Sequence, residues 1–111
     1  MQRDELVKYL DDLLRIKAIE DSSNNGLQVE GAAQVRRLAF AVDASLAAFE
    51  GARAAGAQML VVHHGLFWGQ PLMVTGTHRR RLGMLIDAEI SLYAAHLPLD
   101  FHPELGNNVT L

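Results

Sequence analysis

Residues 59–65 read Met-Leu-Val-Val-His-His-Gly, an apolar run of four residues that is followed by two histidines and a glycine. Similar apolar runs lie before and after it, at 38–42 and 90–95, as is typical of strands that are covered on both faces. Two segments with apolar residues at helical spacing, 45–55 and 77–88, separate the three runs. The order strand, helix, strand, helix, strand favours parallel pairing through right-handed crossovers. We therefore expect an α/β fold with a mostly parallel sheet that is flanked by helices.

The N-terminal part of the chain adds a helix and a short strand to this plan. Residues 4–16 carry leucines at helical spacing along one face, and Asp4 is placed to cap that helix. A turn-rich segment with an Asn-Gly pair follows at 21–26, and 27–29 is predicted to be a short edge strand. Five residues of the apolar runs are expected to be buried in the sheet: Val42, Leu60, Val61, Leu92 and Tyr93.

The composition limits the classes of protein to which this chain can belong. With 111 residues, 50% of them hydrophobic, we expect a single α/β domain over 1–111 and not a disordered chain. No cysteine is present, so any metal must be bound by nitrogen and oxygen ligands. The formal net charge of −3 gives no support to a nucleic-acid partner. The apolar runs are too short to span a bilayer and no signal peptide is evident, so we expect a cytoplasmic protein without a membrane partner.

Polar, titratable residues follow the carboxyl end of each predicted strand. Asp43 follows the first run, His63 and His64 follow the second, and His96 follows the third, with Asp100 shortly after. Ligands of open parallel sheets bind at this edge, so these side chains are expected to converge. Imidazole and carboxylate are the natural ligands of Zn, Mn, Fe or Co when no thiolate is available. The residues thus suggest a metal site, and the alternative is a set of capping or hydrogen-bonded residues at a sheet edge.

The two adjacent histidines allow more than one arrangement. Neighbouring side chains on a regular strand point to opposite faces, so His63 and His64 can share one ion only where the strand has ended. Gly65 would let the backbone bend sharply at that point. Alternatively, each histidine serves a different ion of a two-metal centre, in which Asp100 bridges ions ~3.5–4 Å apart.

The remaining polar residues near the strand ends have competing interpretations. His96 is a metal ligand, a proton shuttle or a residue that orients Asp100, and a purely structural histidine is the alternative. Asp43 precedes the Ala-rich helix, so we expect it to cap the N-terminus of that helix. His102 lies in a polar loop and is expected to be solvated.

Two further segments bear on the choice of ligand or partner. Arg79–Arg81 lie near the start of a helix, where a solvent-exposed face is favoured over a phosphate site. Phe67 and Trp68 are suited to stacking on a planar ligand, to a local hydrophobic plug or to a subunit contact. No glycine-rich nucleotide-binding loop and no nucleophile elbow are present in the sequence.

Three motifs connect the chain to a known family. They are Asn24-Asn25-Gly26-Leu27-Gln28-Val29, His63-His64-Gly65-Leu66-Phe67-Trp68 and His96-Leu97-Pro98-Leu99-Asp100, the last followed by Pro103-Glu104-Leu105-Gly106-Asn107-Asn108. With these motifs the chain resembles, over essentially its whole length, the Nif-three-like dinuclear metal centre family. Members of that family are often labelled GTP cyclohydrolase 1 type 2 homologues. The resemblance implies an α/β fold with two divalent ions, to which His63 and His64 bind from one side while Asp100 binds or bridges them.

The resemblance also implies an assembly and an activity. Family members form dimers and, commonly, ring-shaped hexamers, so we expect a homo-oligomer with Phe67 and Trp68 as candidate contacts. The family label suggests hydrolysis of a purine nucleotide ring. Family members are much longer than this chain, and a later His with a nearby Glu completes their metal centre. The sequence stops before that part, and on this ground we expect weak metal binding and no detectable turnover.

Two classes of function fit these residues. In a metal-dependent hydrolase of a nucleotide-type substrate, the ions activate water and His96 acts as the catalytic acid or base. In a metal-binding or partner-binding module without turnover, the ions organise an assembly. We predict a divalent-metal-binding protein with His63, His64 and Asp100 as ligands, and the sequence leaves enzymatic activity open.

Overall fold

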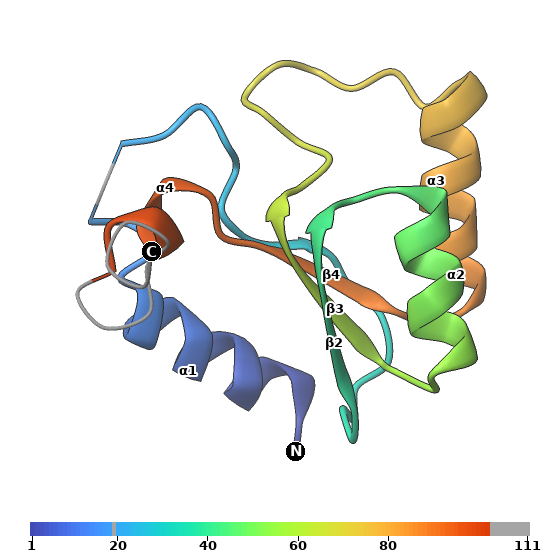
Figure 1. Cartoon of the computed structure of the whole chain (residues 1–111), viewed down its shortest axis with the longest axis horizontal. Coiled ribbons are helices and arrows are strands. Elements are labelled where there is room, and N and C mark those ends of the chain that lie inside the picture. The colour runs from blue at the N-terminus through green and yellow to red at the C-terminus, as the bar shows by residue number, and fades with distance from the viewer. Residues whose placement is uncertain (19, 103–111) are drawn as a thin grey trace.

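The apolar runs of the sequence form a four-stranded sheet in the order β1-β4-β3-β2 (Figure 1). In the computed structural model, which describes residues 1–18 and 20–102, three strands are parallel: β2 (Leu38–Asp43), β3 (Met59–His64) and β4 (Ser91–Ala94). β1 (Gly26–Val29) lies at one edge and pairs antiparallel with β4. The predicted α/β class and mostly parallel sheet are confirmed, and the segment 103–108 of the third motif lies outside the described residues.

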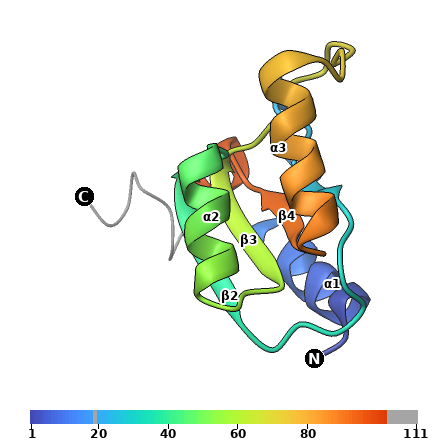
Figure 2. The same ribbon diagram turned by 90° about the vertical axis from the view of Figure 1, so that its right-hand side faces the viewer.

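Helices cover both faces of this sheet (Figures 1 and 2). On one face, α1 (Arg3–Leu14) packs through Leu6 against Tyr93 of β4. On the other, α2 (Leu46–Ala54) and α3 (Gly76–Asp87) form the crossovers between the parallel strands and pack through Phe49 and Leu85. The short helix α4 (Leu97–Asp100) follows β4 and completes the elements of the described chain. No helix among the described residues is long and apolar enough to cross a membrane.

The burial of the sheet is uneven across its strands. Leu60, Leu92 and Tyr93 are at most 1% exposed, as predicted, and Val61 is partly buried. The prediction for Val42 is wrong, because that side chain is 63% exposed. β2 is an edge strand, and the hydrophobic cluster under α1 includes only Leu38 from it. The apolar run 38–42 therefore forms a strand that is covered on one face only.

A partly buried hydrogen bond joins α1 to the middle of the sheet. The Tyr93 hydroxyl donates to Asp11 Oδ1 at 2.8 Å, and Tyr93 itself has no exposed surface. Burial, and then the adjacent Asp11 carboxylate, raise the pKa of Tyr93 well above its usual range. The neutral phenol thus fixes α1 to β4 close to the residues that follow β4 in the chain.

Candidate metal centre

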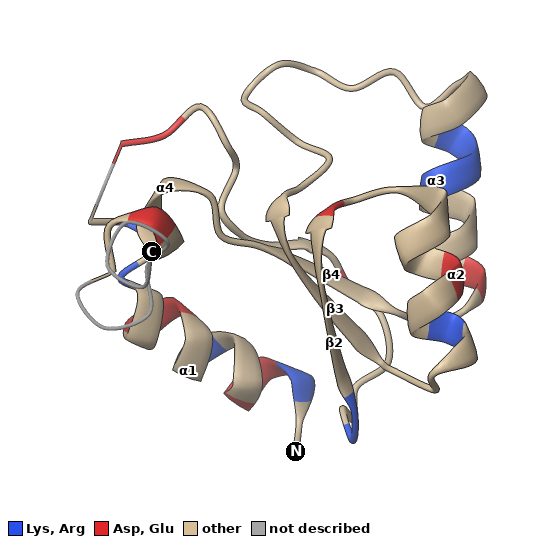
Figure 3. Ribbon diagram, viewed as in Figure 1, with Lys and Arg blue, Asp and Glu red and all other residues tan. Residues whose placement is uncertain are grey.

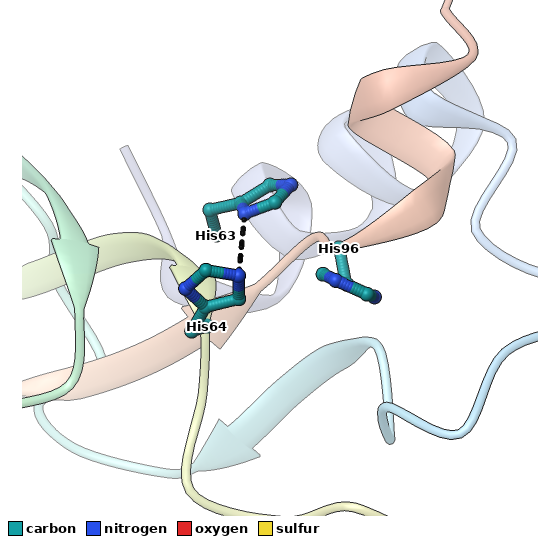
Figure 4. A group of neighbouring side chains, drawn as sticks. All are labelled: His63, His64 and His96. Atoms are coloured by element: carbon teal, nitrogen blue, oxygen red, sulfur yellow. Dashed lines mark hydrogen bonds between the residues drawn. The ribbon is translucent and has the colours of Figure 1, made fainter. Parts of the chain in front are cut away.

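The two histidines of β3 meet at the end of that strand. β3 pairs with β4 only as far as Val62, while its pairing with β2 continues to His64, opposite Asp43. The His63 and His64 rings lie with Nδ1 of the first 3.1 Å from Nε2 of the second (Figure 4). The alternation expected of a regular strand is thus lost for these two rings, which converge above the carboxyl edge of the sheet.

Gly65 makes this strand end possible by the space it leaves and not by an unusual backbone. A Cβ at this position would overlap the Gln28 side chain of β1 and lie 2.7 Å from Cβ of Ala94. Gln28 Oε1 accepts a hydrogen bond from Leu66 N at 2.8 Å, so the side chain of β1 crosses directly over the glycine. The close approach keeps the chain after His64 against the sheet.

Carboxylates lie next to both of these rings. His63 Nε2 is 2.9 Å from Oδ1 of Asp100, which α4 supplies, and His64 Nδ1 is 2.8 Å from Oδ1 of Asp43. If both carboxylates are ionised they can only accept, so each of these ring nitrogens carries a hydrogen. The two nitrogens that face each other, Nδ1 of His63 and Nε2 of His64, are then left with lone pairs that a cation could accept.

His96 completes the cluster from the junction of β4 and α4. Its ring centroid lies 4.8 Å from that of His63 and 5.3 Å from that of His64. One ring nitrogen from each of the three histidines lies within 4.8 Å of the others (Figure 4). Asp100 joins this cluster through His63, so the three predicted ligands and the predicted catalytic residue occupy one region.

The His96 ring is fixed by a buried carboxylate that the sequence analysis did not single out. His96 Nδ1 is 3.1 Å from Oδ1 of Asp21, a side chain that is 3% exposed. Asp21 also accepts hydrogen bonds from Ser23 N, Asn25 Nδ2 and Leu97 N. Burial alone would raise the pKa of Asp21, but these hydrogen bonds together outweigh it and hold the pKa well below its usual range.

Trp68 forms one wall of the cluster. Its indole packs edge-on against the His96 ring with centroids 5.0 Å apart and lies 6.1 Å from the His64 ring. Trp68 Nε1 donates to the carbonyl oxygen of Gly65 at 3.0 Å, which fixes the indole over the end of β3. Phe67 is partly buried against the core under α2 and α3. Both aromatic residues thus contact their own chain.

Two expectations near the site are wrong. Asp43 does not cap α2, because Ser45 is the N-cap and its side chain accepts from Ala48 N at 3.1 Å. His102 is not solvated but 7% exposed, and its Nε2 donates to the carbonyl oxygen of Leu13 at 2.8 Å. Asp43 contacts His64 instead of the start of α2, and His102 contacts Leu13 instead of solvent. Both partners lie far along the chain from the residue that they contact.

The arginines of α3 lie apart from the candidate site. Arg79 and Arg80 are exposed, as expected of a solvent-facing helix surface. Figure 3 shows the basic segment of α3 on the right of the molecule, whereas α4, which carries Asp100, lies on the left.

The donor set fits a divalent cation. Its atoms are imidazole nitrogens and carboxylate oxygens, which suit Zn, Mn, Fe or Co. In a tetrahedral zinc site with bonds near 2 Å, neighbouring ligand atoms are about 3.3 Å apart. The distance between His63 Nδ1 and His64 Nε2, at 3.1 Å, is close to that spacing. Carboxylates on Nδ1 of His64 and of His96 are the kind of partner that metal-bound histidines usually have.

Comparison with known proteins identifies the family of this chain. The sequence model of the family Duf34/NIF3 (NGG1p interacting factor 3) matches residues 1–111. The chain belongs to the Duf34/NIF3 family. This confirms the resemblance that the three motifs indicated.

Its relatives in the family are longer proteins. The "GTP cyclohydrolase 1 type 2 homolog" of Deinococcus radiodurans is 53% identical over 109 residues, which are 98% of this chain and 41% of the relative. That of Pyrococcus horikoshii is 55% identical over 111 residues, 100% of this chain and 44% of the relative. The crystal structure of TTHA1606 from Thermus thermophilus matches with a TM-score of 0.94 and 56% identity, over 96% of this chain and 45% of that chain. The chain thus spans less than half the length of these Duf34/NIF3 relatives.

Proposed function

We propose that this chain is a divalent-metal-binding protein with His63, His64 and Asp100 as ligands and His96 beside them. The observation that carries the proposal is the convergence of three imidazoles within 4.8 Å at the end of parallel strands, with Asp100 2.9 Å from one of them. Imidazole nitrogens that meet in this way beside carboxylate oxygens are the donor set that a divalent cation prefers when no thiolate is available.

We propose that the site takes two ions. As the resemblance to the family implies, each of the adjacent histidines, His63 and His64, would serve a different ion. Three ligands leave open coordination positions around two ions, which water, another subunit or the remainder of a longer protein would fill.

The finer proposal is a metal-dependent hydrolase that acts on a nucleotide-type substrate. Bound divalent ions lower the pKa of a coordinated water and stabilise negative charge that develops on the substrate. His96 has one ring nitrogen directed to Asp21 and one left to accept or donate a proton, so we propose it as the catalytic acid or base. The printed name of the curated relatives, GTP cyclohydrolase 1 type 2 homolog, supports a nucleotide substrate. Since the chain spans less than half of those relatives, this activity is proposed for a complete site.

The second candidate is a metal-binding module without turnover, whose ions organise an assembly. It is supported by the exposure of the site, because Asp43 and His64 lie on the surface with side chains 70% and 43% exposed. Turnover of a nucleotide by metal-loaded protein, lost on chelation, would favour the hydrolase over the module.

Metal binding can be followed directly through Trp68, the one tryptophan of the chain. Titration with Co²⁺ is expected to quench its fluorescence in a saturable way, because the indole packs on the His96 ring of the proposed site. A chelator should restore the signal, and a pH indicator in weak buffer should report proton release on binding. Unchanged fluorescence and no proton release up to millimolar Co²⁺ would contradict the proposal.

We also propose that the chain forms a homo-oligomer, through residues other than those suggested by the sequence. Phe67 and Trp68 contact their own chain, whereas Phe40 and Val42 of the edge strand β2 are 73% and 63% exposed. Light scattering at micromolar concentration should show an assembly that Phe40→Ser weakens. Ile86→Ser on α3, which is also exposed, is the matched control and should leave the assembly unchanged. A monomer at that concentration would be contrary to this expectation.

A further inference from the structure

We propose that Asp21 is a positioning residue of the metal centre, which holds His96 in the form that carries its hydrogen on Nδ1 and leaves Nε2 bare for the site. The inference rests on the proposed function, since it explains what sets the orientation and the tautomer of His96 in that site. It concerns a contact between two segments that lie 75 residues apart in the chain.

The chemistry of the contact selects one form of the His96 ring. An ionised carboxylate can only accept hydrogen bonds, so the ring nitrogen that faces it must be the donor. Both oxygens of Asp21 lie near His96 Nδ1, at 3.1 and 3.2 Å, and the carboxylate is almost completely buried. Water therefore has little access to compete for the same nitrogen. A neutral His96 with its hydrogen on Nδ1 has a lone pair on Nε2, and a lone pair is what a cation or a proton requires.

The surroundings of Asp21 hold the carboxylate rigidly in this place. Its Oδ2 accepts from Leu97 N at 2.9 Å and from Asn25 Nδ2 at 3.0 Å, and its Oδ1 accepts from Ser23 N at 3.1 Å. Asn25 in turn accepts from His96 N at 2.9 Å. The segment 21–25 is thus hydrogen-bonded to the backbone at the junction of β4 and α4. The same segment orients the His96 side chain, through the Asp21 carboxylate.

His64 provides an internal comparison. Its Nδ1 lies 2.8 Å from Asp43, a shorter contact than the 3.1 Å of His96 with Asp21, but the Asp43 side chain is 70% exposed and that of Asp21 is 3% exposed. Water can replace Asp43 as an acceptor, whereas nothing can readily replace Asp21. The two carboxylates therefore differ in how firmly they hold the imidazole beside them.

The direct test is the tautomer of His96 in metal-free protein, read from long-range ¹H–¹⁵N correlation spectra of histidine-labelled chain. The unaltered protein is expected to show a protonated Nδ1 and a bare Nε2 for His96. In Asp21→Asn the side chain has one acceptor oxygen for four donors and adds an NH₂ group of its own. The His96 signals should then shift toward protonated Nε2.

Two controls separate positioning from a merely structural role. Asn25→Ala removes the hydrogen bond that Asn25 donates to Asp21 and the one that it accepts from His96 N. The Asp21 carboxylate itself is kept, so His96 should keep its hydrogen on Nδ1. Asp43→Asn should change the signals of His64 and leave those of His96 in place. If Asp21→Asn does not fold, the unaltered protein and Asn25→Ala still decide the question through the same signals.

The outcomes are distinguishable from those of the proposed function. A His96 with its hydrogen on Nε2 in the unaltered protein, or one that is unchanged in a folded Asp21→Asn, overturns the role of Asp21. Failure of the unaltered protein to bind Co²⁺ instead refutes the proposed function. The tautomer measurement does not depend on metal and gives its own answer in that case.

Discussion

The double variant His63→Ala, His64→Ala is expected to take up no Co²⁺ at concentrations that saturate the unaltered protein. It removes both imidazoles that β3 contributes, and it leaves Asp100 without the ring nitrogen 2.9 Å away. Elemental analysis after dialysis, or the Trp68 fluorescence titration, measures the loss.

The fold of this double variant should remain close to that of the unaltered protein. Both side chains lie at the end of β3 and belong to neither hydrophobic cluster, so their removal costs little packing. Circular dichroism and the denaturant midpoint check this point. His78→Ala, on α3 and outside the histidine cluster, is the matched control and should retain full uptake. Equal uptake by the double variant and this control would place the metal elsewhere.

Leu60→Ala is expected to lower the free energy of unfolding by roughly 2–5 kcal/mol. The side chain is 1% exposed and belongs to the core under α2 and α3, so truncation leaves a cavity that its neighbours on β2 and β4 cannot close. Chemical denaturation followed by far-UV circular dichroism gives the difference in free energy.

Val42→Ala is the comparison variant for Leu60→Ala on the same sheet. Val42 is 63% exposed, and surface substitutions of this kind usually change stability by less than about 0.5 kcal/mol. Similar losses for the two variants would mean that Val42 is covered in solution, which in turn would support association through β2.

The order of strands and helices could be predicted because each element depends on its own residues. An apolar run such as 59–62 between two helical segments is typical of a buried strand, and the Ala-rich segment forms α2 because its apolar positions recur at helical spacing. The convergence of His63, His64 and His96 follows from the same order, since the carboxyl ends of parallel strands meet at one edge of the sheet.

What could not be predicted depends on contacts between segments far apart in the chain. The exposure of Val42 depends on β2 being an edge strand, and the order of strands in a sheet is a property of the whole packing. His102 is buried because its ring reaches the end of α1, 89 residues earlier. No local pattern around either residue contains that information.

For Asp21, the neighbouring residues predict the local turn but not the contact with His96. Its neighbours predict a turn, which is correct as far as it goes, because Asp21 accepts from Ser23 N two residues along the chain. Its contact with His96 exists only because that turn packs against the start of α4, where Leu97 N and the His96 ring reach the same carboxylate. Residue types and strand order are enough to place His63, His64 and His96 at one edge of the sheet. The burial that makes one carboxylate a firm partner and leaves another on the surface arises only when helices, turns and sheet pack together.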